Sequence, residues 1–289
     1  MRLANLDGRA TLMAPTGERG VDVAEASGGK FGPEVQGLYD EWDAFRTFAA
    51  RLDLNTVATT VLDQGDLRAP VPAPRQVFAI GLNYRAHAAE AGTELPSVPA
   101  TFTKFPASLT GPFAEVELPN GTVDWEVELV VVIGRRADRV AMADAWSHVA
   151  GLTIGQDLSD RTLQFAAGGQ FSLGKSHRGF SPLGPWVVTP DELDDPDDLA
   201  LGCSIDGETV QDARTSDLVF GVPQLIAELS AVVPLLPGDL IFTGTPGGVG
   251  VSRRPPRFLQ PGETLESWIE GIGTIRTQLV APLARHDAG

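Results

Sequence analysis

Residues 123–134, VDWEVELVVVIG, constrain the fold of this chain more than any other segment, because they read as a β-strand that carries acids. Side chains alternate between the two faces of a strand. One face would hold Asp124, Glu126, Glu128, Val130 and Val132, and the other Trp125, Val127, Leu129 and Val131. Acidic pairs usually meet water at a solvated edge, but here valines continue the acidic face and the opposite face is wholly apolar. We therefore expect burial on both faces toward the C-terminal end of the strand.

Paired carboxylates on one buried face need a partner of opposite charge. Glu126 and Glu128 stand two residues apart, so their side chains would lie about 7 Å apart or less. In a medium of low dielectric constant such acids repel each other unless a proton or a cation sits between them. The strand by itself leaves two interpretations open, a metal site and a site with a shared proton.

A third acid follows another apolar run, GLTIGQD, which ends at Asp157. Ser159 is a candidate N-cap for a helix over 160–167, on which Arg161 and Gln164 would share one face. Two glutamates and an aspartate, without histidine or cysteine nearby, are the oxygen donors that select a hard divalent ion such as Mg²⁺ or Mn²⁺. Taken alone, Asp157 is equally typical of a helix cap or a turn.

The segment GLNYRAHAAEAG, residues 81–92, predicts a short helix over 84–91. His87 and Glu90 would lie one turn apart on it, so the carboxylate could orient the imidazole and make it a general base toward water. A histidine and a glutamate at this spacing are more often an ordinary surface pair. Both interpretations remain open at this point.

Three further side chains are candidates on weaker patterns. Lys104 in TFTKFP and Lys175 in SLGKSH are isolated lysines, which are usually solvated. The segment TGTPGGVG, residues 243–250, lacks both the Lys-Ser/Thr ending of a phosphate-binding loop and the glycine spacing of a dinucleotide site. We interpret it as a tight turn after a strand, with Thr245 able to present its hydroxyl and backbone N–H groups to an anion.

Short apolar runs separated by turn signals indicate an α+β protein that is rich in strands. Asp-Gly turns in ANLDGRATLM and SIDGETV predict hairpins. Helical spacing occurs over 37–52 and 222–233, beside the segments named above. A proline-rich stretch at 68–76 separates a small N-terminal domain, residues 1–70, from a larger domain, residues 75–289.

Charge and cysteine content limit the partners. The 38 acidic residues outnumber 22 lysines and arginines, and the formal charge of −16 would repel nucleic acid and anionic membrane surfaces. The single cysteine, Cys203, excludes an intramolecular disulfide. No apolar segment approaches the roughly 20 residues of a membrane span, and none resembles the apolar part of a signal peptide. We expect a soluble, cytoplasmic protein.

Seven motifs taken in order resemble the fumarylacetoacetate hydrolase family: GLNYRAHAAEAG, FTKFPASLTGP, DWEVELVVVIGRRA, GQDLSDRTLQ, LGKSHRGFSPLGPWVVTPDEL, TSDLVF and LLPGDLIFTGTPGGVG. The resemblance covers about residues 75 to 281. It implies a β-rich mixed sandwich roll with a small N-terminal domain, a homodimer, and a divalent metal, Mg²⁺ or Mn²⁺, held by Glu126, Glu128 and Asp157. By this resemblance, the strand tolerates two glutamates on one face because a cation would neutralise them.

The same resemblance implies roles for other residues. His87 and Glu90 would be the water-activating dyad, and the groups that bind substrate or stabilise an oxyanion would be Arg161, Gln164, Lys175 and Thr245. Asp124 has no ligand role in this match, and we expect it to support the ligands from behind. The sequence departs from the family pattern at Gln156 and Asp160, and again after Lys175. There, Arg178 could recognise a second carboxylate on the substrate or could be a surface residue.

The implied activity is metal-dependent hydrolysis of a carbon–carbon bond in an acylpyruvate-like 2,4-dioxo acid. The 1-carboxylate and 2-oxo oxygens of this small anionic substrate would chelate the metal, and His87 would activate a water against the 4-oxo carbon. The alternatives are decarboxylation of an oxaloacetate-like acid, isomerisation of a hydroxyhepta-2,4-diene-1,7-dioate and dehydration of a sugar acid. A non-catalytic protein that binds a metal or a small molecule on the same fold is a further alternative.

Overall fold

A computed structural model of the protein describes residues 1–119, 121–166 and 168–282. The expected strand-rich α+β fold is confirmed. The main sheet has the order β4 (Thr60–Val61), β3 (Arg19–Asp22), β2 (Arg9–Met13), β1 (Arg2–Leu6), β14 (Ser181–Val188), β12 (Val149–Gln156), β11 (Val127–Ile133), β17 (Leu240–Phe242), β6 (Val77–Gly81) and β7 (Ala100–Thr103). Two short strands lie off this path: β5 (Leu67–Arg68) pairs with β1, and β8 (Leu109–Thr110) pairs with β14.

The acidic segment 123–134 forms two strands, where the sequence predicted one. β10 (Val123–Asp124) pairs with β13 (Ser159–Asp160), whereas β11 joins the main sheet between β12 and β17. Trp125 and Glu126 form the step between the two strands. The expected burial of both faces is confirmed, because alternate side chains of β11 enter two different hydrophobic cores: Val127, Leu129, Val131 and Ile133 on one face, and Val130 and Val132 on the other.

A second sheet covers the face of β11 that carries Leu129 and Val131. Its order is β16 (Glu208–Arg214), β15 (Ala200–Ile205), β18 (Thr264–Ile269), β19 (Gly273–Val280) and β9 (Glu115–Glu117). The predicted hairpin between β15 and β16 is confirmed, and its turn residues Asp206 and Gly207 have φ values of 48° and 84°. Positive φ at both positions is what a two-residue hairpin turn of the right twist requires.

Helices of the N-terminal part cover the other face of the main sheet. The expected helix over 37–52 is two helices, α2 (Val35–Asp40) and α3 (Trp42–Ala49), which meet at Glu41. Two shorter helices accompany them, α1 (Val23–Ala26) and α4 (Leu54–Val57). The buried side chains of α2 and α3 pack with those of Val130 and Val132, so this core contains residues from both parts of the chain.

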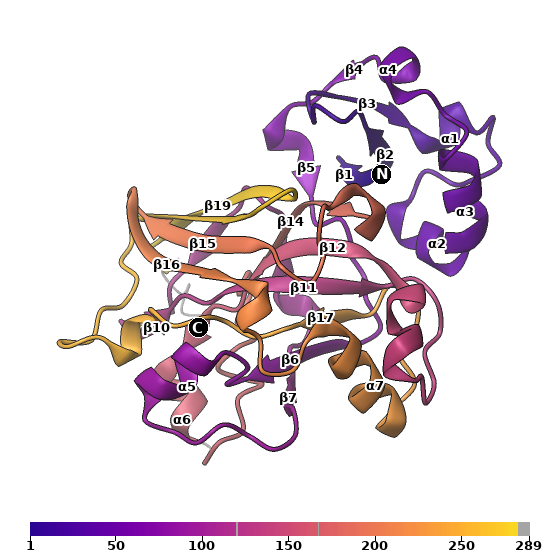
Figure 1. Ribbon diagram of the computed structural model, residues 1–289. Helices are drawn as coiled ribbons and strands as arrows, with labels where there is room; N and C mark the ends of the chain where they lie inside the picture. Colours follow the sequence, from indigo (N-terminus) through magenta and orange to yellow (C-terminus); the bar gives the residue numbers. More distant parts are fainter. Residues whose placement is uncertain (120, 167, 283–289) are drawn as a thin grey trace, which may run out of the picture.

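Figure 1 shows the first 70 residues gathered into a lobe at one side of the molecule. The predicted hairpin of β1 and β2 lies there, with Asp7 and Gly8 in its turn. The main sheet nevertheless continues through this lobe, because β1 pairs with β14. The division into domains 1–70 and 75–289 remains a prediction, and residues 283–289 lie outside the described residues.

The longer helices of the second part agree with the expected segments. They are α5 (Arg85–Ala91), α6 (Arg161–Ala166) and α7 (Val222–Val232), and residue 167 of the expected 160–167 helix is outside the described residues. Short 3₁₀ turns occur at η1 (Gln64–Asp66), η2 (Pro106–Ser108), η3 (Met142–His148), η4 (Pro190–Glu192), η5 (Thr215–Asp217) and η6 (Gly250–Ser252). Within the described ranges, no helix has the length and apolar character needed to cross a membrane. In Figure 1, α5 and α6 lie next to each other, beside β10.

Candidate active site

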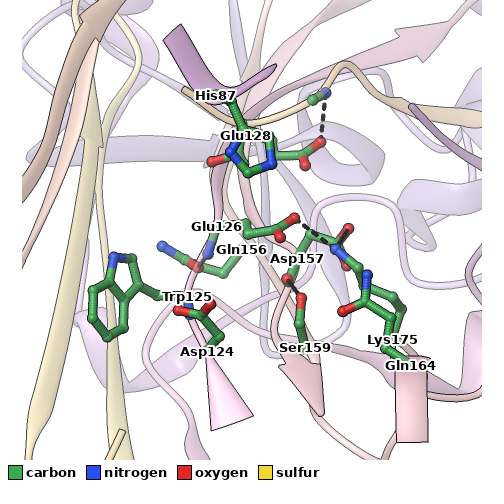
Figure 2. Close-up of polar contacts among 12 residues, drawn as sticks. His87, Asp124, Trp125, Glu126, Glu128, Gln156, Asp157, Ser159, Gln164 and Lys175 are labelled. Carbon is green, nitrogen blue, oxygen red and sulfur yellow. Dashed lines mark hydrogen bonds and ion pairs between the residues drawn. The ribbon is translucent and has the colours of Figure 1, made fainter. Parts of the chain in front are cut away.

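Pairing of β11 with β12 brings the three predicted acids together. The two strands are antiparallel, with Glu128 opposite Gly155 and Val127 opposite Gln156. Asp157 follows β12 directly, and its backbone N–H donates to the carbonyl of Glu126 at 2.9 Å. Glu126, Glu128 and Asp157 are all buried, and one carboxylate oxygen from each lies within 4.8 Å of the others. Figure 2 shows the three carboxylates around one space.

The two glutamates of the triad have opposite pKa shifts. Burial alone would raise the pKa of Glu126, but the charges of Lys175 and Arg161 outweigh it and lower the pKa to about 2. The pKa of Glu128 is raised well above its ordinary value by burial and by the charges of Asp157 and Glu126. Its carboxylate accepts a hydrogen bond from a backbone group, the N–H of Gly244, at 2.8 Å. The triad therefore holds excess negative charge near Glu128, which a proton or a cation would relieve.

Two lysines that the sequence suggested to be solvated are buried against the triad. Lys175 Nζ donates to Glu126 Oε2 at 2.6 Å and to Asp157 Oδ2 at 2.7 Å, as Figure 2 shows. Lys104 Nζ donates to Asp157 Oδ1 at 2.6 Å and to the carbonyls of Lys175 and Phe180. The solvated interpretation of both lysines is wrong, because these acids compensate the cost of burying an ammonium group.

The donor set fits a divalent cation. The ammonium of Lys175 already occupies a position between two carboxylate oxygens, so the site is built to hold positive charge. Glu128 has an elevated pKa that a second positive charge would lower. The three donors are oxygens, which hard divalent ions prefer over softer metals. Glu126, Glu128 and Asp157 are the residues that would hold such an ion.

Arg161 and Gln164 form one hydrogen-bonded unit at the start of α6. Arg161 Nη1 donates to Gln164 Oε1 at 2.8 Å, which confirms that the two residues share a helical face. The same guanidinium contacts Glu126 Oε1 at 2.7 Å. The expected N-cap, Ser159, is wrong: its hydroxyl donates to the carbonyl of Asp157, and Asp160 instead accepts the N–H of Leu163 at 3.1 Å.

His87 and Glu90 are in contact on α5. The Nδ1 atom of His87 lies 2.8 Å from Glu90 Oε1, and Glu90 Oε2 accepts the N–H of Gly248 at 2.8 Å. The glutamate is thereby fixed on both oxygens, once by the imidazole and once by the glycine-rich loop. Because Nδ1 is engaged, Nε2 is the nitrogen that can accept a proton in the cavity that His87 lines.

A cavity of about 280 Å³ joins these groups. Its polar wall includes most of the predicted site residues, namely His87, Glu126, Arg161, Gln164, Lys175 and Thr245. Its apolar wall contains Phe102 and Phe171, whose rings meet edge to face with centroids 5.7 Å apart. The cavity has the size and the mixed polarity of a site for a small organic acid.

Comparison with known proteins fits this geometry. The family model of the fumarylacetoacetate (FAA) hydrolase C-terminal domain matches residues 76–280. The chain belongs to the fumarylacetoacetate hydrolase family. A human mitochondrial oxaloacetate tautomerase is 45% identical over 215 residues, which cover 73% of this chain and 68% of that protein.

Solved structures of the family also match. The crystal structure of a Mycobacterium smegmatis protein is 54% identical, with a TM-score of 0.92, and the match covers 97% of this chain and 99% of that one. A maleylpyruvate hydrolase of Sphingobium sp., solved in complex with manganese(II) and pyruvate, is 31% identical, with a TM-score of 0.79. That match covers 97% of this chain and 99% of the hydrolase. The manganese in that family member and the buried acidic triad together support divalent-metal binding here.

Arg178, which the sequence suggested as a substrate-binding residue, does not line the cavity and lies apart from the other predicted site residues of this family member. Its side chain is exposed and lines a separate hollow with Glu115 and Glu117. Arg178 follows Lys175 by only three residues in the sequence. The chain turns beside it, at Gly179, which has a φ of 80°. Of the two interpretations of Arg178, the structure agrees with that of a surface residue.

Sequence reasoning missed two glutamine roles. Gln211 Oε1 accepts the backbone N–H of Val127 at 3.0 Å, and its Nε2 donates to the Thr245 hydroxyl at 2.8 Å. Gln156 Oε1 accepts the N–H of Glu126 at 2.9 Å. Side-chain amides thus replace ladder hydrogen bonds where the chain steps from β10 to β11. Thr245 itself donates to the carbonyl of Val127 at 2.9 Å, so its hydroxyl proton is already engaged.

Proposed function

We propose that this family member is a divalent-metal-dependent enzyme that converts a small 2-oxo acid through its enol form. The observation that carries the proposal is the buried triad of Glu126, Glu128 and Asp157, of which Glu126 lines a cavity together with His87, the imidazole that contacts Glu90. Mg²⁺ or Mn²⁺ would be held by the three carboxylates. When bound, the ion would supply Lewis-acid stabilisation of negative charge on the 2-oxo oxygen.

The charge of the site favours an anionic substrate. The buried carboxylates are Asp124, Glu126, Glu128 and Asp157, and the buried cations in contact with them are Lys104, Lys175 and Arg161. Fully ionised, these groups carry a net charge of −1, which a divalent ion changes to +1. A carboxylate that enters the cavity then meets net positive charge, although the protein as a whole carries −16.

Keto–enol tautomerisation of an oxaloacetate-like acid is the reaction that we place first. It needs one base at C3 and one donor at the 2-oxo oxygen. His87 Nε2 would remove the C3 proton, and the Lys175 ammonium would protonate the oxygen, which gives the enol. The human relative named an oxaloacetate tautomerase is 45% identical to this chain, and it supports placing tautomerisation before the other reactions.

Hydrolysis of an acylpyruvate is the second candidate, and the His87–Glu90 pair is the observation that favours it. In this reaction His87 would take a proton from the water that attacks the 4-oxo carbon, while Lys175, Arg161 and Gln164 would donate hydrogen bonds to the oxyanion. The related maleylpyruvate hydrolase supports it. The cytoplasmic location and the homodimer remain predictions.

One set of assays distinguishes these reactions. Purified protein would receive enol-oxaloacetate, acetylpyruvate or fumarylpyruvate, with Mg²⁺, Mn²⁺ or a chelator, and the products would be identified directly against an enzyme-free control. Metal-dependent decay of the enol without pyruvate supports the tautomerase. Pyruvate plus a free acid from a dioxo acid supports the hydrolase, and pyruvate from oxaloacetate indicates a decarboxylase. Full activity in metal-stripped protein would refute the proposed function, and metal binding without any turnover would support the non-catalytic alternative.

A further inference from the structure

Asp124 is a buried acid outside the triad, and its carboxylate accepts an unusual number of hydrogen bonds. Its Oδ1 accepts the N–H of Trp125 at 2.9 Å and that of Gly250 at 2.7 Å. Its Oδ2 accepts from Arg161 Nε at 2.9 Å and Nη2 at 2.7 Å, and from the N–H of Val251 at 3.0 Å. One fully buried carboxylate therefore joins the step before β11, the start of α6 and the turn η6.

Arg161 is shared between this acid and the triad. Its Nη2 lies 2.7 Å from Asp124 Oδ2 and 2.7 Å from Glu126 Oε1. Among the described residues, Asp124 and Glu126 are the two carboxylates that form ion pairs with Arg161. Both charges raise the pKa of the guanidinium against the effect of its burial, and the contribution of Asp124 exceeds that of Glu126. Without Asp124, the buried cation would rely on Glu126 alone.

The same carboxylate also fixes part of the cavity wall. Val251 and Ser252 line the cavity, and the backbone N–H groups of Gly250 and Val251 are held by Asp124. A side chain at position 250 would place its Cβ 2.8 Å from Asp124 Oδ1 and 1.9 Å from the carbonyl of Arg257. Glycine is therefore required at 250 for the close approach of this turn to the carboxylate.

We propose that Asp124 is a positioning residue for the metal site. It pairs with Arg161, so that the guanidinium competes less for the lone pairs of Glu126 that a divalent ion would use, and it holds the 250–251 turn against the cavity. The inference rests on the proposed function, because it assumes that the triad binds a divalent ion. Loss of a hydrogen-bonding partner behind a metal ligand typically weakens metal binding about 10- to 100-fold.

Mn²⁺ binding by calorimetry tests this role without reference to turnover. We expect Asp124→Asn to weaken Mn²⁺ binding at least about tenfold, because Arg161 then competes for Glu126. Arg161→Met should tighten Mn²⁺ binding, since it frees Glu126 from its guanidinium. The double variant should bind Mn²⁺ about as tightly as Arg161→Met, because Asp124 acts through Arg161. A merely structural role of Asp124 would make the double variant weaker than Arg161→Met by the same factor that separates Asp124→Asn from the wild type.

Asp239 supplies the matched control. It is a fully buried acid elsewhere in the fold, and it accepts from Gln76 N at 2.9 Å, Gln76 Nε2 at 2.7 Å and Leu236 N at 2.7 Å. Asp239→Asn should lower the melting temperature and leave Mn²⁺ affinity unchanged. If Asp124→Asn does not fold, the Mn²⁺ affinity of Arg161→Met tests the inference by itself. Mn²⁺ binding by Arg161→Met that is as weak as in the wild type, or weaker, would overturn the inference. Wild-type protein that binds no Mn²⁺ would instead overturn the proposed function and the premise taken from it.

Discussion

Glu126→Gln and Glu128→Gln remove the same charge from neighbouring positions, yet we expect them to affect the metal-free protein differently. The pKa of Glu126 is lowered to about 2, although burial opposes this, because Lys175 and Arg161 stabilise its ionised form. The pKa of Glu128 is raised by burial and by two adjacent acids. Glutamine resembles a protonated glutamate, so it replaces the favoured form of Glu128 and the disfavoured form of Glu126.

The expected magnitudes differ accordingly. Glu126→Gln breaks one side of a buried ion-pair network, which costs about 3 kcal/mol of unfolding free energy, since Arg161 keeps Asp124 and Lys175 keeps Asp157 as partners. For a protein of this size such a loss lowers the melting temperature by roughly 6 to 12 °C. Glu128→Gln should leave the metal-free stability unchanged or raise it. Metal at a concentration of 100 times its Kd should raise the unfolding free energy of the wild type by about 2.7 kcal/mol. Both variants should lose this stabilisation.

The difference between Glu128→Gln and the wild type should depend on pH. The folded protein binds the proton of Glu128 more tightly than the unfolded chain, because the folded pKa is raised above its ordinary value of 4.5. Wild-type stability without metal therefore falls as pH rises from about 4.5 toward the raised pKa. The stability of Glu128→Gln does not fall in this way, because glutamine does not titrate. The stability of this variant relative to the wild type should therefore increase as pH rises above about 4.5.

Thermal unfolding followed by circular dichroism, with chelator and with Mn²⁺, measures all of these quantities. The wild type serves as the reference in both conditions. If Glu128→Gln destabilised the chelated protein as much as Glu126→Gln does, the assignment of opposite protonation preferences would be wrong. If either variant kept the full metal-induced shift, that glutamate would not be a metal ligand.

Three further variants probe the rest of the site. Lys175→Met removes the ammonium between Glu126 and Asp157, so Mn²⁺ should bind more tightly by calorimetry while turnover falls about 100-fold or more; unchanged turnover would exclude Lys175 from the chemistry. Glu90→Gln should reduce turnover roughly 100-fold with the same Mn²⁺ affinity, because it disturbs the orientation of His87 and can still accept the Gly248 N–H through its amide oxygen. Arg178→Ala should leave kcat/KM unchanged, because its side chain lies outside the cavity, and a loss of activity would show that the substrate extends beyond it.

The parts of the fold that were predicted from the sequence depend on short-range chemistry. Asp7-Gly8 and Asp206-Gly207 predicted their hairpins because these dipeptides accept positive φ at both turn positions. The alternation along 127–133 predicted the burial of both strand faces, since the period of a strand is fixed by backbone geometry. The spacing of about one helical turn predicted the contacts of His87 with Glu90 and of Arg161 with Gln164, because the period of a helix is also fixed by backbone geometry.

The parts that could not be predicted depend on distant partners. Lys104 reaches Asp157 across 53 residues of sequence, Gln211 reaches Val127 across 84, and Asp124 reaches Gly250 across 126. Nothing local distinguishes such a lysine from a solvated one, because the acids that compensate its burial lie elsewhere in the chain. The cap of α6 was misplaced by one residue because β13 extends through Ser159 and Asp160, and pairing with β10 fixes where the helix can begin.

Strand β11 is held by neighbours on both edges and by hydrophobic cores on both faces, whereas much of the cavity wall comes from α5, α6 and the segment around Phe171. This arrangement separates the evolution of the chemistry from the evolution of specificity. A substitution that shifts β11 disturbs two cores at once, so Glu128 within the strand and Glu126 directly before it are difficult to relocate. Insertions or replacements in the surface elements can reshape the wall at little cost to the scaffold. A single metal-binding framework can thereby accept new substrates by exchanging its surface segments.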